Sequence, residues 1–135
     1  MDFASQIAPF SWDEFEGTVS VTMYTSHKYK KELFKTRKEE GFDGSGYDWE
    51  SLAQVLLQEK APDLIDKIDF DSERLCFVAY SADKDAMKRF ILMFKGVCEN
   101  DELITDIFSR TAPQEPITED DMKSVLDMIM NRDKN

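Results

Sequence analysis

The chain has 135 residues and a formal net charge of −11, with 41% hydrophobic residues, ten Phe and two Trp. This length suits one domain with a core of its own, and an apolar content this high excludes a disordered chain. The acidity argues against nucleic acid as the direct partner, because a polyanion is bound by clustered Lys and Arg. It is compatible with a basic protein partner, although many acidic domains are acidic only for solubility.

Two further features bear on the compartment. No window reaches the roughly 18 apolar residues that a membrane helix needs, and the opening MDFASQIAPF has neither a basic leader nor an apolar signal core. Cys76 and Cys98 show no CxxC spacing, and each lies in an apolar pattern that is typical of a reduced core thiol. We therefore expect a cytoplasmic protein that makes no membrane contact.

The first expected elements form a hairpin. Thr18–Tyr24, TVSVTMY, alternates apolar residues with Ser and Thr, which is the period of two of a half-buried strand. Phe10–Phe15 is the expected preceding strand, and Glu16-Gly17 is the turn between them.

A basic helix is expected after the hairpin, capped by Ser26 and ended by Gly41, because glycine adopts the left-handed backbone of a helix end without a side-chain penalty. Its apolar side holds Tyr29, Leu33 and Phe34. A charge run on the other side is usually plain solvated surface, and a binding role is the alternative. The basic side consists of Lys28, Lys30, Lys31, Lys35, Arg37 and Lys38.

The stretch GFDGSGYDWESLA, residues 41–53, either holds a ligand or turns the chain into a helix. Gly44-Ser45-Gly46 lacks the Lys and Ser or Thr of a Walker loop, and it does not follow a strand as a dinucleotide-binding loop does. As a calcium loop starting at Asp43, it has Gln54 where a bidentate glutamate is required. We therefore interpret the stretch as a tight turn.

Asp48 is the expected N-cap of the next helix, with Glu50 in its first turn, where the helix dipole favours an acid. Pro62 fits the start of a short helix over Asp63–Lys67. The expected buried stripe of the first of these helices is Trp49, Leu52, Ala53, Leu56 and Leu57.

The second half of the chain predicts one more strand and three more helical segments. Leu75–Tyr80, LCFVAY, is apolar on both sides, which is typical of a central strand covered on both faces. Ser81 or Asp83 caps the long helix that follows, Leu103–Phe108 continues as another, and a last helix begins at Thr118 after the linker TAPQEP. The apolar positions of the long helix are Ala86, Met87, Phe90, Ile91, Phe94, Val97 and Cys98.

Strands and helices do not alternate regularly, which favours an α+β fold over a doubly wound sheet. We expect a single compact domain over residues 1–135, in which residues 111–135 are a C-terminal extension with an extra helix. A small antiparallel sheet, made of the hairpin and the strand near 75–80, packs with about five helices.

A catalytic site is hard to assemble from these residues. His27 is the only histidine and lies beside a run of lysines, and neither GxSxG nor HExxH occurs. Cys76 lies in an apolar strand where a thiolate is disfavoured. Acid pairs such as Asp69 with Asp71, or the run Glu119–Asp121, could bind a metal only if distant acids converged on them. We predict no enzymatic activity and no cofactor, with a metal-dependent enzyme as the least favoured alternative.

The motif GxxGxGYDWxSLA at Gly41 to Ala53, followed by KAPDL and KIDFDSE, resembles the immunity protein 51 family of bacterial polymorphic toxin and contact-dependent inhibition systems. The resemblance covers roughly residues 10–110, and PFSWDEFEGTVSV is similar to the family's opening. Arg74-Leu75 departs from the small residue that family members more often carry, which puts only the strand start in doubt.

The resemblance implies a small cytoplasmic inhibitor that binds a cognate toxin domain stoichiometrically, so that the producing cell survives. Many such toxins are nucleases with basic active-site clefts, and an acidic protein suits that kind of target. The alternative is an acidic interaction or regulatory domain with no toxin partner. The oligomeric state stays open.

Within the motif, the glycines and Asp48 set the turn, whereas Tyr47, Trp49 and Leu52 are expected to pack. The resemblance assigns no toxin contacts, so the predicted contacts rest on charge alone. Glu99 to Asp121 holds eight acids against Arg110 alone. The structural positions are Gly41, Gly44, Gly46, Tyr47, Asp48 and Trp49, and the predicted toxin-binding acids are Asp43, Glu50, Asp69, Asp71, Glu99, Asp101, Glu102, Asp106, Glu119, Asp120 and Asp121.

Overall fold

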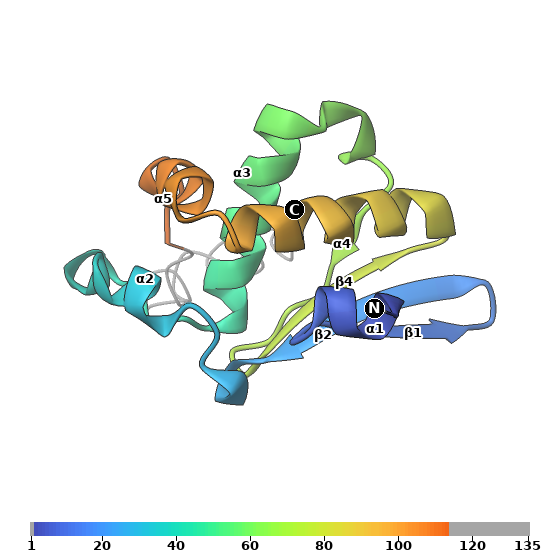
Figure 1. Cartoon of the computed structure of the whole chain (residues 1–135), viewed down its shortest axis with the longest axis horizontal. Coiled ribbons are helices and arrows are strands. Elements are labelled where there is room, and N and C mark those ends of the chain that lie inside the picture. The colour runs from blue at the N-terminus through green and yellow to red at the C-terminus, as the bar shows by residue number, and fades with distance from the viewer. Residues whose placement is uncertain (1, 114–135) are drawn as a thin grey trace, which may run out of the picture.

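The computed structural model describes residues 2–113, which form a four-stranded antiparallel sheet and five α-helices (Figure 1). This confirms the predicted α+β class. The helix expected from Thr118 lies outside the described residues. The sheet order is β1 (Ser11–Phe15), β2 (Thr18–Tyr24), β4 (Cys76–Ser81) and β3 (Asp69–Phe70), and the helices are α1 (Phe3–Ile7), α2 (Lys31–Lys35), α3 (Gly46–Lys60), α4 (Lys84–Cys98) and α5 (Asp101–Ser109).

The predicted hairpin is confirmed. Phe15 pairs with Thr18 across a two-residue turn in which Glu16 and Gly17 have φ of 50° and 82°. Positive φ at both central residues is the turn geometry that matches the twist of two antiparallel strands. The next strand in the sheet is β4, which pairs antiparallel with β2, and β3 completes the sheet on the far side of β4.

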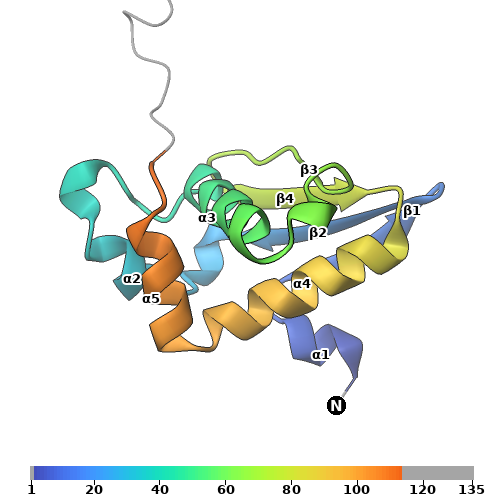
Figure 2. The ribbon, with the colours of Figure 1, turned by 90° about the horizontal axis from the view of Figure 1, so that it is seen from above.

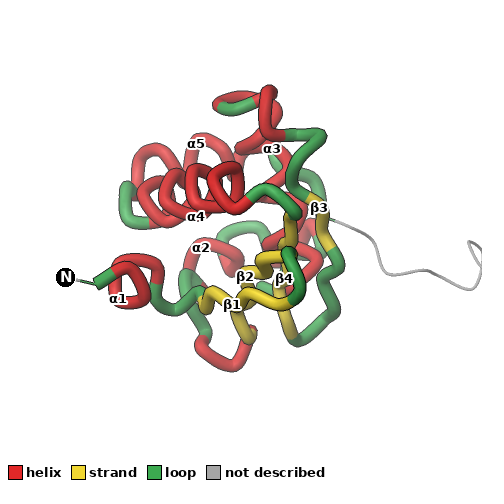
Figure 3. Tube along the Cα trace, turned by 90° about the vertical axis from the view of Figure 1, so that its right-hand side faces the viewer, coloured by secondary structure: helices red, strands yellow, loops and turns green. Residues whose placement is uncertain are grey.

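The prediction that Leu75–Tyr80 is covered on both faces is wrong. Phe77 and Ala79 of β4 are fully buried, whereas Cys76 and Val78 are half-buried and Tyr80 is 37% exposed. Alternate side chains of a strand point to opposite faces, so one face of the sheet meets the core and the other does not. Figures 2 and 3 show α1 and α4 on one side of the sheet, and no described helix lies across the opposite side.

An aromatic cluster on the covered face joins the helices to the sheet. The Trp49 ring of α3 lies 5.8 Å from Phe94 of α4 and 5.2 Å from Phe34 of α2, measured between centroids. Phe94 in turn lies 5.8 Å from Phe77 of β4. Buried aromatic pairs in edge-to-face geometry contribute beyond their area burial. The predicted stripe of α3 is confirmed, because all five of its residues are buried.

The predicted helix from Ser26 to Gly41 is wrong in its extent. Only the five residues of α2 are α-helical, and Lys28 and Lys30 before it both have positive φ, 54° and 55°. Between these two breaks Tyr29 stacks on the α3 tryptophan with an interplanar angle of 8°. Tertiary packing therefore overrides a helical pattern that carries no strong cap. Gly41 ends a short 3-10 turn with φ of 110°, as its predicted left-handed role requires.

Three smaller features differ from the sequence-based expectation or refine it. The short helix expected over Asp63–Lys67 is a 3-10 turn at Pro62–Leu64. The N-cap of α4 is Asp83 rather than Ser81, because its carboxylate accepts the Ala86 backbone N–H at 3.0 Å. The sequence does not predict helix α1 or the two-residue strand β3, because each is too short to show a hydrophobic period.

We predict opposite effects for alanine at two helical glycines. A Cβ at Gly46 would overlap the carbonyl oxygens of Glu73 and Cys76, whereas one at Gly96 in α4 meets nothing within 4 Å. Gly46→Ala should lower the free energy of unfolding by more than about 2 kcal/mol. Gly96→Ala should raise it by up to about 1 kcal/mol, because glycine is a poor helix former. Urea unfolding followed by circular dichroism measures both, and equal effects would contradict the close packing at residue 46.

Candidate interaction surfaces

The glycine loop is a helix cap and not a ligand cradle. Ser45 is the N-cap of α3, and its Oγ accepts the Asp48 backbone N–H at 3.3 Å. The Asp48 carboxylate accepts the backbone N–H groups of Asp43, Gly44 and Ser45 at 2.8, 2.9 and 3.3 Å. This reciprocal arrangement is a capping box. The prediction that Asp48 itself is the N-cap is therefore wrong by three residues, because its side chain reaches back to the loop from inside the first turn.

The glycines of the loop serve this cap directly. Gly44 has φ of 79°, a left-handed conformation that side chains disfavour. Gly46 donates its N–H to the Arg74 carbonyl at 2.9 Å and touches the backbone that leads into β4. Trp49 is 1% exposed and packs as expected, whereas Tyr47 is 37% exposed, contrary to its expected packing. Burial raises the pKa of the Asp48 carboxyl, against the lowering effect of its backbone donors.

Catalytic and metal chemistry finds little support in the described part of the chain. Among residues 2–113, no three His, Cys, Asp or Glu side chains gather in a way that could hold a metal ion. Burial raises the pKa of the Cys98 thiol to about 12 and also raises that of Cys76, so neither thiol is poised as a nucleophile. Over the same residues, no helix combines the length and the apolar character that crossing a bilayer requires.

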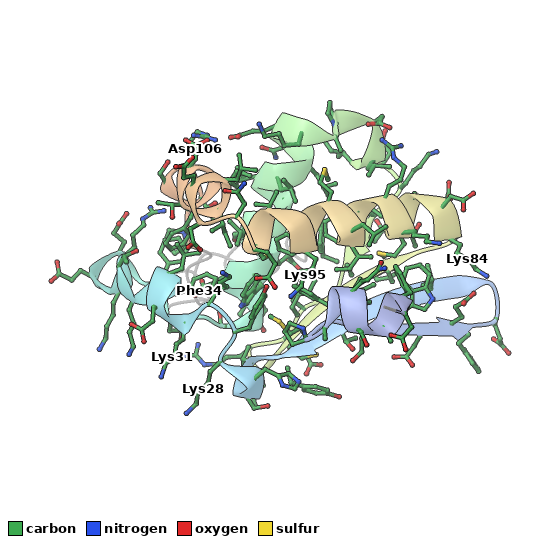
Figure 4. The ribbon with its side chains drawn as sticks, in the orientation of Figure 1. Lys28, Lys31, Phe34, Lys84, Lys95 and Asp106 are labelled. Atoms are coloured by element: carbon green, nitrogen blue, oxygen red, sulfur yellow. The ribbon has the colours of Figure 1, made fainter. Side chains whose placement is uncertain are left out.

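The predicted acids around α5 are mostly engaged within the chain. Glu99 contacts Lys95 at 2.7 Å, and Asp101 contacts Lys30 at 3.6 Å. Asp106 contacts Arg110 at 2.8 Å, and Arg110 also reaches Glu59 at 2.6 Å (Asp106 is labelled in Figure 4). The hydrogen bonds from Lys95 and Arg110 lower the pKa values of Glu99 and Asp106 respectively. Within the described residues, Glu102 is the acid of this group that makes no ion pair.

The other predicted acids lie on a different side of the molecule. Asp43 forms an ion pair with Arg74 at 2.5 Å, and Glu50 accepts the Ser72 backbone N–H at 3.3 Å. Asp69 and Asp71 are exposed, and neither makes an ion pair with any described residue. Figures 2 and 3 show β3 and α5 at opposite sides of the fold, so the predicted acids form two groups rather than one patch. Glu119, Asp120 and Asp121 lie outside the described residues.

The basic segment, residues 28–38, borders three hollows of the described surface. One of about 260 Å³ lies between Lys28, Lys31, the glycine loop and Arg74. A second of about 220 Å³ and a third of about 490 Å³ also include Lys31 in their walls. Figure 4 shows Lys28 and Lys31 at the outer edge of the fold, and neither makes an ion pair with a described residue. The sequence shows the charge run but not the hollows, because these depend on the breaks at residues 28 and 30.

Comparison with known families adds what geometry alone does not. Residues 10–113 match the family described as immunity protein 51. The chain belongs to the immunity protein 51 family. The matched range contains the whole sheet, the glycine loop and helices α2 to α5, and it confirms the resemblance found over roughly residues 10–110. The comparisons with curated proteins and with solved structures gave no match.

In this immunity protein the motif residues from Gly41 to Ala53 build the start of α3 and its junction with β4. Each polar group of the motif that is buried is used internally, since no buried side-chain nitrogen or oxygen of the described residues lacks a hydrogen-bond partner. The motif therefore identifies the fold, and contacts with another molecule have to come from other residues.

We predict that Asp48 acts on stability. Asp48→Ala removes the acceptor of three backbone N–H groups and should cost about 2–3 kcal/mol of unfolding free energy. Asp48→Asn keeps one side-chain oxygen and should cost about 1 kcal/mol. Urea unfolding at pH 7 measures both values. If Asp48→Ala left the stability unchanged, the capping role described above would be wrong.

Proposed function

We propose that this protein binds a cognate bacterial toxin domain one-to-one and neutralises it by binding, without catalysis. The observation that carries the proposal is the family match over residues 10–113. The geometry is consistent with it, because the buried polar groups of the family motif serve the scaffold and leave no cluster with catalytic chemistry among the described residues. On this proposal the protein acts in the cytoplasm and has no cofactor.

The charge supports a basic target, for which a toxin with a nucleic-acid cleft is the natural candidate. A net charge of −11 attracts a cationic surface, and unlike fields raise association rates from about 10⁵–10⁶ M⁻¹ s⁻¹ toward about 10⁸–10⁹ M⁻¹ s⁻¹ at low salt. Seating an acidic surface on such a cleft would also exclude the polyanionic substrate. The acids predicted from the sequence remain proposed contacts, and those without an internal ion pair keep their full charge for a partner.

The first test uses the toxin domain encoded next to this protein. Mixing the two should give a one-to-one complex by size exclusion with light scattering, and co-expression should abolish toxicity. The association rate constant, measured by surface plasmon resonance, should fall steeply as salt is raised, because exposed charges are screened beyond about 8 Å at physiological ionic strength. Absence of binding at low salt would sink the proposal.

A second candidate function is a regulatory domain that binds an acidic partner through the basic segment. The observation that favours it is the group of hollows bordered by Lys28 and Lys31, both without an ion pair in the described part of the chain. Such a protein would need no toxin.

The double variant Lys28→Glu/Lys31→Glu separates the two functions. If acids bind the toxin, the variant should bind it as fast as the unmodified protein or faster, because the protein becomes more negative. Surface plasmon resonance gives the rate, and circular dichroism confirms that the variant is folded. Loss of toxin binding by a folded variant would transfer the interface to the basic segment.

A further inference from the structure

The side of the sheet that faces away from the helices carries an ordered pattern of side chains. The strand register places Ser20 of β2 between Asp13 of β1 and Tyr80 of β4, and Asp69 of β3 is the partner of Tyr80 on the other side. A row of four residues therefore crosses the sheet with an aspartate at each end. Neighbouring strands lie about 4.8 Å apart, so the two ends are separated by roughly 14 Å.

The next row repeats the arrangement. Thr22 lies between Ser11 and Val78, and Asp71 follows β3 and donates its backbone N–H to the Val78 carbonyl at 3.1 Å. The middle of this face is thus made of Ser, Thr, Val and Tyr side chains, and acids occupy both of its edges.

Large aromatic side chains add apolar surface to the same face. Phe15 of β1 is 75% exposed, Tyr24 of β2 is 60% exposed and Tyr80 of β4 is 37% exposed. All three point away from the core, because the alternate strand positions hold buried residues such as Met23 and Ala79. An exposed group of large apolar residues with a polar rim is typical of an interaction site.

The charge of this face is not compensated. None of its strand positions holds Lys or Arg, and Asp13, Asp69 and Asp71 make no ion pair with any described residue. Basic residues near the ends of the strands are engaged elsewhere. Lys84 contacts Glu14 at 2.5 Å, Lys67 contacts Asp83 at 3.4 Å and Arg74 contacts Asp43 at 2.5 Å.

We infer that this open sheet face, defined by Asp13, Ser20, Asp69, Asp71 and Tyr80 with the aromatic residues beside them, is the surface on which the toxin docks. The inference rests on the proposed function. The partner it fits is a protein surface with an apolar centre bordered by Lys or Arg on two sides. A helix is about 10–12 Å wide with its side chains, so a cationic helix fits between the two acidic edges. The centre excludes water while the acids speed and orient the encounter.

Protection of the sheet edges and self-association both leave features of this face unaccounted for. Acids on edge strands protect a sheet from pairing with further sheets, which accounts for Asp13 and Asp69 but not for the exposed aromatic residues between them. A second copy of this chain packed face to face would bring the aspartates of both copies together, and like charges at close range cost stability.

The first experiment compares two double variants with the same change in net charge. Asp69→Lys/Asp71→Lys reverses charge on the face, and Glu39→Lys/Glu102→Lys reverses two exposed acids outside it that make no ion pair within residues 2–113. By surface plasmon resonance at low salt, the face variant should associate with the toxin domain at least about tenfold more slowly and with a weaker salt dependence. The control should change by less than about threefold.

The second experiment uses two tyrosines of equal exposure. Tyr80 and Tyr47 are both 37% exposed, and Tyr80 alone lies on the face. Tyr80→Ala should raise the Kd for the toxin by about 30-fold, as truncation of a central aromatic residue does, whereas Tyr47→Ala should change it by less than about threefold. If Tyr80→Ala does not fold, Ser20→Arg adds bulk and positive charge at the same row and should weaken binding as strongly.

Failure of the inference and failure of the proposed function are distinguishable. If the unmodified protein does not bind the toxin, the proposed function fails. If it binds and the face variants bind equally well, the docking surface lies elsewhere and the function stands. A free protein that is a dimer by light scattering and becomes a monomer in Ser20→Arg would show that a second copy covers the face, which also overturns the inference.

Discussion

Helix α3 meets the sheet at a point where the backbone leaves no room for a side chain. Gly46 donates to the Arg74 carbonyl at 2.9 Å and lies against the carbonyls of Glu73 and Cys76. This contact fixes where α3 begins, and about one helical turn later Trp49 enters the core. Since the Trp49 ring contacts aromatic residues from α2, α4 and the segment before β1, the whole covered face of the sheet depends on the fit at residue 46.

The same junction explains why a family motif can identify a fold and leave the partner open. Ser45 and Asp48 are consumed in capping, and Gly44 and Gly46 are required by backbone geometry. Strand positions that point away from the core carry no such constraint. An inhibitor family whose members meet different targets can change these positions without disturbing the aromatic cluster, because alternate residues of a strand have independent surroundings.

Much of the fold is predictable because it depends on long or regular patterns. The alternation in Thr18–Tyr24 predicts β2 with its buried side, and the helical spacing from Ala86 to Cys98 predicts α4. The wrong predictions have physical causes. LCFVAY has the pattern of a strand buried on both faces because Val78 and Tyr80 are apolar, yet they lie on the open face. The breaks at Lys28 and Lys30 follow from the stacking of Tyr29 on Trp49, a contact that no local pattern contains.

The candidate surfaces are harder to predict, because a sequence shows where acids are and not what they contact. Glu99, Asp101 and Asp106 have the same charge as Asp69 and Asp71, but each of the first three lies within 4 Å of a cation of its own chain. Ion-paired acids still contribute to a net charge when two proteins are separated by more than a Debye length of about 10 Å at 0.1 M salt. At contact distance they offer a partner less, since a new cation has to compete with the existing one. Long-range attraction therefore depends on the total charge of the protein, whereas the position of docking depends on the acids that the fold has left unpaired.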